Sequence, residues 1–261
     1  MTRATRPVGG LCLAVLLWWA LTAAVPDDPT LSRITPARTF VGVQELWGMS
    51  LFDDAASSIF RLLTGLVLAT ATGTLIGVAV GTSSAAEESS RPVLLFLRMV
   101  SPLSWAPVAV GVLGVGDPPV IALVAATAIW PVLAAASDGV RSVDPEHLLV
   151  ARSFGADRWE LWRSVTWPTL QPRLLGGIRA SVGIAWVVLV PAEMLGVTSG
   201  LGYAVLNAKD QLAYHHITAL ILVIGTLGYV IDVLARWLLR TPRERAGERT
   251  VRATTGRVAV R

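Results

Sequence analysis

The strongest constraint on this chain is a series of long apolar stretches that carry almost no charge and alternate with connections containing arginine. An α-helix needs about 20 apolar residues to cross the hydrocarbon core of a bilayer. Six stretches approach that length, at residues 8–25, 59–81, 93–115, 120–137, 174–197 and 217–239. Only 15% of the residues are charged, compared with about 25% in soluble domains. We therefore predict an all-α integral membrane protein with about six transmembrane helices.

These stretches divide the chain into four parts. The parts are a first transmembrane helix (1–25), an extracytoplasmic loop with a short interfacial helix at 46–56 (26–58), a core of five transmembrane helices with a cytoplasmic loop at 139–172 (59–240), and a basic cytoplasmic tail (241–261). The tail is polar, rich in arginine and without apolar periodicity, so we expect it to be disordered or to lie on anionic headgroups.

The first apolar stretch has two interpretations. Arg3 and Arg6 precede an apolar region that ends in small residues, which is the pattern of a cleaved signal peptide. The pair Trp18 and Trp19 favours a retained helix that ends at a membrane interface. Cys12, the only cysteine, lies in this stretch, which excludes an internal disulfide and a metal site built on cysteine; we expect it to be a small buried apolar residue.

The distribution of basic residues predicts the orientation of the chain. With the N-terminus in the cytoplasm, the cytoplasmic parts hold Arg3, Arg6, Arg91, the row Arg141, Arg152, Arg158, Arg163 and Arg173, and the tail from Arg240. The outside parts hold only Arg33, Arg38 and Lys209. Cytoplasmic loops carry an excess of Lys and Arg, so both termini are expected in the cytoplasm of a cell whose plasma membrane holds the protein. Basic residues that flank apolar spans also exclude nucleic acid as a partner.

Small residues recur every four positions in the second stretch, at Gly65, Ala69, Gly73, Gly77 and Gly81. At 3.6 residues per turn they fall close to one face of a helix. Such a face lets a neighbouring helix approach closely, so we expect these glycines to pack against another span.

The cytoplasmic loop at 141–172 is too polar to span a membrane and too well patterned to be irregular. Asp144 is a good N-cap followed by proline, and Gly155 suits the left-handed end of the helix that begins there. Asp157 and Glu160 predict a capping box for a second short helix, which Pro168 is expected to end. The loop is thus predicted to be a helix–glycine–helix elbow.

Trp159, Trp162 and Val165 recur at helical spacing and form an apolar stripe on the second short helix. Two interpretations remain open for them. They lie against the span ends and headgroups, or they insert into a partner protein.

The same loop resembles the signature of importer permeases of the ATP-binding cassette (ABC) class, in which Glu-Ala-Ala, three residues, Gly, nine residues and Ile-x-Leu-Pro mark the helix that docks on the ATPase. This chain has Ala151, three residues, Gly155, nine residues and then Val-Thr-Trp-Pro. It departs from the pattern at Leu149, Val150 and Trp167, and Leu149 removes the acidic side chain that would pair with the ATPase. Further stretches, such as GIRASVGIAWVVLVPAEMLG, are similar to the nitrate, sulfonate, taurine and bicarbonate branch.

The resemblance implies a homodimeric permease that works with ATPase subunits inside and a solute-binding protein outside, and that translocates a small oxyanion or sulfonate. It assigns the docking loop to Ala151, Phe154, Gly155, Trp159, Trp162, Val165 and Pro168. ATP would be used by the partner subunit, and this chain itself would bind no cofactor.

The energy source has to lie outside this chain if ATP drives transport. A P-loop needs a lysine after a glycine-rich turn, and the only lysine, Lys209, has no such turn before it. We therefore expect no enzyme activity. The alternative is an ion-coupled secondary transporter, which would need several carboxylates within the membrane, whereas Glu193 stands nearly alone there.

Ionisable residues within spans are costly and usually face protein or water. Glu193 is predicted either to line or gate the translocation path or to anchor neighbouring helices by hydrogen bonds. Asp232 and Arg236 are expected to pair at i, i+4. Arg61, Arg98 and Arg179 are interpreted as anchors that reach the interface. No metal site is expected at His215 and His216, because no carboxylate cluster accompanies them in the sequence.

Overall fold

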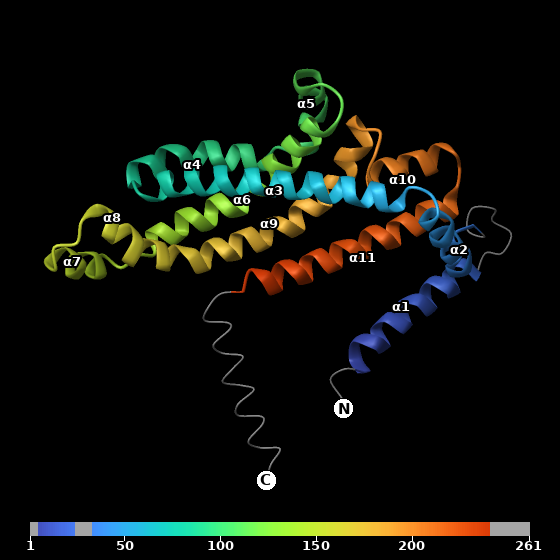
Figure 1. Cartoon of the computed structure of the whole chain (residues 1–261), viewed down its shortest axis with the longest axis horizontal. Coiled ribbons are helices and arrows are strands. Elements are labelled where there is room, and N and C mark those ends of the chain that lie inside the picture. Colours follow the sequence, from blue (N-terminus) through green and yellow to red (C-terminus); the bar gives the residue numbers. More distant parts are fainter. Residues whose placement is uncertain (1–4, 24–32, 241–261) are drawn as a thin grey trace, which may run out of the picture.

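The computed structural model describes residues 5–23 and 33–240, and every regular element in these ranges is a helix. Four long apolar helices run along the molecule, as Figure 1 shows: α3 (Leu51–Gly81), α6 (Asp117–Arg141), α9 (Trp167–Gly196) and α11 (Tyr214–Leu238). Short helices lie at the two ends. α7 (Pro145–Ser153) and α8 (Arg158–Leu161) lie at one end, and α2 (Pro36–Trp47) and α10 (Leu201–Asp210) at the other. The all-α membrane fold predicted from the apolar stretches is confirmed.

The centre of the fold is the close packing of α3 on α6. A Cβ placed on Gly77 would come within 2.5 Å of the Leu133 carbonyl oxygen, and one on Gly65 within 2.6 Å of the Val124 side chain. Gly73 and Gly81 face the same helix, where a Cβ would lie 3.0 and 2.8 Å from backbone oxygens of α6. The absence of side chains at these positions lets the two helix backbones approach.

The apolar stretch at 93–115 is not one straight span. α4 (Ser84–Met99) and the segment formed by a short 3₁₀ helix (Pro102–Trp105) and α5 (Ala106–Leu113) are bent by 82°. Pro102 lacks a backbone N–H and forces the residue before it into an extended conformation, so Ser101 has ψ 124° and the helix breaks there. The prediction of a single helix over these residues was wrong.

Four helices in residues 5–23 and 33–240 are long and apolar enough to cross a membrane, and the bent pair raises this number to five. The apolar part of α1 (Thr5–Ala23) is shorter, covering Cys12–Ala23. The count of about six therefore stays a prediction. Cys12 is exposed on α1, so the prediction that it is buried was wrong for the isolated chain.

The segment before the first long span differs from the prediction. α2 ends at Trp47, a turn follows, and α3 already begins at Leu51, so residues 46–56 are not a separate interfacial helix. α2 packs on the start of α11, where a Cβ on Gly42 would meet the His215 carbonyl oxygen at 2.7 Å. The hydroxyls of Thr39 and Thr218 are hydrogen-bonded at 2.9 Å across the same contact. The tail at 241–261 lies outside the described residues.

Candidate functional site

The first helix of the 141–172 loop has the caps that its sequence predicts. The Asp144 side chain accepts a hydrogen bond of 2.9 Å from the Glu146 N–H, and Pro145 occupies the first turn. After α7 ends, Gly155 has φ +85°, a left-handed conformation that glycine adopts without steric cost. The Ala156 N–H then closes the turn on the Ala151 carbonyl at 3.2 Å. The elbow is therefore built from local hydrogen bonds.

The second helix starts with the predicted capping box. The Asp157 carboxylate accepts a hydrogen bond of 2.7 Å from the Glu160 N–H, and the Glu160 carboxylate accepts one of 3.0 Å from the Asp157 N–H. Two of the otherwise unpaired N–H donors at the helix start are thereby satisfied. These two hydrogen bonds fix the direction in which α8 leaves the elbow.

Pro168 does not end this helix, which corrects the prediction. A π-helical turn at Trp162–Thr166 carries the Trp167 N–H to the Trp162 carbonyl, and α9 follows at once with Pro168 in its first turn. Proline is tolerated there because its missing N–H falls where the hydrogen-bond register changes. The result is one helix of 39 residues from Arg158 to Gly196.

The predicted tryptophan stripe is split between two environments. Trp162 is half-buried and packs against a cluster formed by Val132, Ala136, Leu170 and Leu174. Trp159 is 66% exposed, and Phe154 at the elbow is 87% exposed. Leu149 and Val150 on α7 are also exposed. The end of the loop thus carries an apolar surface that residues 5–23 and 33–240 leave exposed.

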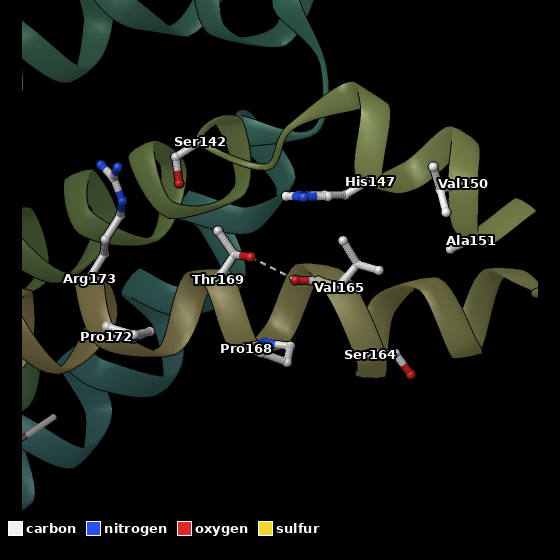
Figure 2. Close-up of a pocket in the computed structure, with 10 residues that line it drawn as sticks. All are labelled: Ser142, His147, Val150, Ala151, Ser164, Val165, Pro168, Thr169, Pro172 and Arg173. Atoms are coloured by element: carbon white, nitrogen blue, oxygen red, sulfur yellow. Dashed lines mark hydrogen bonds between the residues drawn. The ribbon is translucent and has the colours of Figure 1, made fainter. Parts of the chain in front are cut away.

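A cleft of about 670 Å³ separates α7 from the beginning of α9. Figure 2 shows the His147 ring lying between the two helices, with Val165 and Thr169 on the opposite wall. The Thr169 hydroxyl donates to the Val165 carbonyl at 2.8 Å, so it is satisfied within its own helix. Ala151, Val165 and Pro168 of the predicted docking set all line this cleft.

A buried ion pair lies at the other end of α9. The Arg61 Nη1 donates to Glu193 Oε1 at 2.7 Å, and the two side chains are 3% and 0% exposed. The Arg61 Nε also donates to Asp117 Oδ1 at 2.7 Å. The prediction that Arg61 is an interfacial anchor was therefore wrong. Its guanidinium joins α3 to α6 and α9 instead of reaching the headgroups.

The Glu193 carboxylate is hydrogen-bonded on both oxygens. The Ser58 hydroxyl lies 2.9 Å from each of them, and the Gly202 N–H at the start of α10 donates to Oε2 at 2.9 Å. Arg61 is also held by Ser199, whose carbonyl and hydroxyl accept bonds of 2.8 and 2.7 Å. Glu193 is fully buried in this conformation, and its contacts connect α9 to α3 and α10.

The partners of Glu193 were missed in the sequence. Ser58 and Arg61 lie more than 130 positions from it along the chain. Gly202 lies only nine positions after it but carries no signal of its own in the sequence. One signal was available: Arg61 and Glu193 are both charges within predicted spans, and opposite charges within a membrane pair with each other.

One predicted charge pair is present, and the structure also places Arg98 and Arg179, whose role as interfacial anchors stays a prediction. The Arg236 Nε donates to Asp232 Oδ2 at 2.7 Å, which confirms the expected i, i+4 pair. Arg98 is exposed on α4. Arg179 is half-buried and donates to the Leu239 carbonyl at 2.7 Å, at the end of α11.

The fold also brings Glu45 to the histidine pair at the start of α11. Glu45 Oε2 lies 2.8 Å from His216 Nε2 and 3.3 Å from His215 Nε2. The hydrogen bond from His216 holds the pKa of Glu45 below its ordinary value, so this carboxylate is ionised at neutral pH. These are residues that could hold a metal ion, and Glu45 was missed because 171 positions separate it from His216.

The chain is similar to known transport proteins over most of its length. Residues 69–244 match the family model described as binding-protein-dependent transport system inner membrane component. The taurine transport system permease protein of Escherichia coli strain K12 is 29% identical over 244 residues, covering 90% of this chain and 88% of the relative. The nitrate import permease protein of Synechococcus elongatus is 31% identical over 186 residues, covering 70% and 67%. The bicarbonate transport system permease protein of the same organism is 29% identical over 192 residues, covering 73% and 69%.

A solved structure supports the fold. A chain of the MetNI methionine ABC transporter in an inward-facing conformation matches with a TM-score of 0.56, covering 70% of this chain and 93% of that one, at 14% identity.

Proposed function

The chain belongs to the family of binding-protein-dependent transport system inner membrane components, and from this membership we propose how it works as an ABC importer permease. It passes a small oxyanion or sulfonate, delivered by an extracytoplasmic binding protein, through the membrane. The relatives are named for taurine, nitrate and bicarbonate, each a small solute with an anionic group whose charge is spread over several oxygens. This shared chemistry supports the solute class.

The observation that carries the proposal is the exposed apolar end of the 141–172 loop. Phe154 and Trp159 are 87% and 66% exposed on a loop whose backbone is fixed by caps and by the left-handed Gly155. Large apolar side chains on a rigid cytoplasmic surface are typical of a protein interface. We assign this surface to the ATPase subunit, which binds and hydrolyses the ATP that this chain does not use.

The continuous helix from α8 to α9 supports the coupling of ATP hydrolysis to transport. A helix of 39 residues is about 58 Å long, so displacement of the docking loop at one end is carried to the Glu193 network at the other. Glu193 then links this helix to α3 through Arg61 and to α10 through the Gly202 N–H. Rigid-body motion of the loop would therefore tilt three elements together.

The remaining assignments follow the resemblance. The loop lies in the cytoplasm with both termini, and the Glu193 network lies toward the outside. Two copies of the chain enclose the path, and exposed apolar residues of α5 such as Val108 and Val112 are available for the contact between them. The second copy covers this face in the assembled permease.

Reconstitution tests the proposal. The chain is placed in liposomes alone, with its ATPase, and with ATPase and binding protein, and uptake of labelled taurine, nitrate and bicarbonate is measured with and without ATP. Uptake is expected only when all components and ATP are present. Uptake by the chain alone, driven by a proton or sodium gradient, would instead establish the secondary transporter.

The solute is identified separately by native mass spectrometry of the binding protein, with a neutral amino acid as the competing ligand. An oxyanion or sulfonate is expected in its site. A transported solute that carries neither a sulfonate nor an oxyanion group would refute the solute class and leave the permease assignment intact.

A further inference from the structure

Glu45, His215 and His216 form a compact cluster between α2 and α11. Their ligand-type atoms all lie within 4.8 Å of one another, and the two imidazole rings have centroids 4.2 Å apart. Both Nε2 atoms point at a single oxygen, Glu45 Oε2, at 2.8 and 3.3 Å. Neighbouring histidines usually diverge around a helix, but here the first turn of α11 turns both toward α2.

We propose that Glu45, His215 and His216 bind a divalent transition-metal ion of the zinc class. Zinc binds imidazole nitrogen and carboxylate oxygen at about 2.0–2.2 Å, which places two ligands of one tetrahedral ion about 3.4 Å apart. The distance from His215 Nε2 to Glu45 Oε2, 3.3 Å, is already close to this separation, and the 2.8 Å distance from His216 Nε2 would lengthen by about 0.6 Å on binding. Three protein ligands leave the fourth position to water. Imidazole-rich sites favour zinc and copper over magnesium and calcium, which prefer oxygen ligands.

The ligands are held in place by the packing of α2 on α11. Gly42 lets the two backbones approach next to His215, and the hydrogen bond between Thr39 and Thr218 fixes their rotation. The side chains remain reachable by an ion, since Glu45, His215 and His216 are 49%, 33% and 18% exposed. A site that is fixed and accessible needs little rearrangement to bind.

The competing explanation is an ion pair between Glu45 and a protonated histidine. Both rings lie against the same Glu45 oxygen, so a single ion pair with one histidine does not account for the position of the second ring. A metal ion would take one ligand atom from each of the three side chains. Glu45 provides the negative charge that a divalent ion needs at this position.

The consequence is a metal clamp that joins the N-terminal helices to the core. α2 also contacts α1, where the Trp18 Nε1 donates to the Ile34 carbonyl at 3.1 Å just before α2. In the proposed orientation this clamp lies on the extracytoplasmic side, where the metal would come from the surroundings of the cell. The inference does not depend on which solute is carried.

The test is zinc binding by the assembled transporter, purified in detergent with an affinity tag that contains no histidine. Bound Zn²⁺ is counted by plasma mass spectrometry, and its affinity is measured by competition with a chromophoric chelator. Glu45→Gln, His215→Gln and His216→Gln should each weaken binding by at least about 100-fold, because loss of an outer-shell partner alone costs 10–100-fold. His216→Cys keeps a zinc ligand and should retain binding.

His147→Gln is the matched control, since His147 is the only other histidine and lies in the loop at the opposite end of the molecule. It should bind Zn²⁺ as the unmodified protein does, and Mg²⁺ should not compete. Equal zinc binding by all variants, or no binding by the unmodified transporter, would overturn the site and leave Glu45 as an ion-pair partner. Size-exclusion profiles identify any variant that fails to fold. In that case the Zn²⁺ binding of His216→Cys is compared with that of the unmodified transporter: retained binding supports the site, and lost binding contradicts it.

Discussion

Arg61 of α3 and Glu193 of α9 form a salt bridge of 2.7 Å in which both side chains are almost fully buried. The pair lies 132 positions apart in the sequence and connects the two longest helices of the described chain. Burial of charges is costly unless each is paired and hydrogen-bonded, and here Ser58, Asp117, Ser199 and Gly202 complete the set. This network fixes one end of the bundle.

Removing the arginine alone should destabilise the protein strongly. Arg61→Met leaves Glu193 buried without its cation, which typically costs about 3–5 kcal/mol. We expect a large fall in the apparent melting temperature in detergent and in the folded yield. Arg98→Met is the matched control, because Arg98 is exposed on α4. Equal stability of the two variants would contradict the structural role of the pair.

Neutralising the carboxylate separates its two possible roles. Glu193→Gln keeps the shape and can still accept from Arg61, but it weakens each charge-assisted bond. If Glu193 is a helix anchor, Glu193→Gln should lower the folded yield and the total uptake in parallel, with near-normal uptake per folded complex. Uptake and folded yield are measured on the same membranes. Normal yield with uptake lost would show instead that Glu193 gates the path.

The long spans and the loop caps could be predicted because each depends on local rules. A helix needs about 20 apolar residues to cross the lipid, so the long apolar stretches predict α3, α6, α9 and α11 without knowledge of their neighbours. Asp144 and Asp157 cap the residues that immediately follow them, so their roles are readable within a few positions.

The features that were missed depend on distant partners or on a change of hydrogen-bond register. Its position in the sequence suggests that Arg61 is an interfacial anchor. Arg61 is instead a buried ion-pair partner, because the fold brings Glu193 of α9 to it. Pro168 reads as a helix end, yet the π turn before it absorbs the missing donor. Hydropathy alone cannot distinguish the 82° bend at Ser101–Pro102 from a straight span.

The split between the two loop tryptophans predicts different defects. Trp159→Asp changes an exposed side chain, so the chain should fold normally but bind the ATPase poorly. Trp162→Asp places a charge against Val132 and Leu170 and should cost roughly 2 kcal/mol or more, about half the loss at a fully buried tryptophan. Copurification of the ATPase and thermal stability in detergent are measured for both. Identical defects in the two variants would contradict this division.

The glycine face of α3 predicts sensitivity to added methyl groups. Gly77→Ala places a Cβ within 2.5 Å of the Leu133 backbone, so the α3–α6 contact has to open, at a cost of about 1–3 kcal/mol. Gly176→Ala is the control, because a Cβ there meets nothing within 4 Å and alanine is the better helix former. Thermal stability should fall for the first variant and hold or rise for the second. The reverse order would contradict the packing.

The elbow itself can be tested through the backbone conformation of Gly155. A Cβ at this position meets nothing within 4 Å, so any defect of a substitution comes from φ +85° and not from a clash. Gly155→Val should be strained by about 1–3 kcal/mol and turn α8 away from its direction, abolishing ATP-dependent uptake while the spans stay folded. Asparagine also adds a side chain, but it adopts the left-handed region more readily than valine. Gly155→Asn should therefore retain much of the uptake. If valine and asparagine behaved alike, steric access to the docking surface and not the angle of the elbow would be what the ATPase requires.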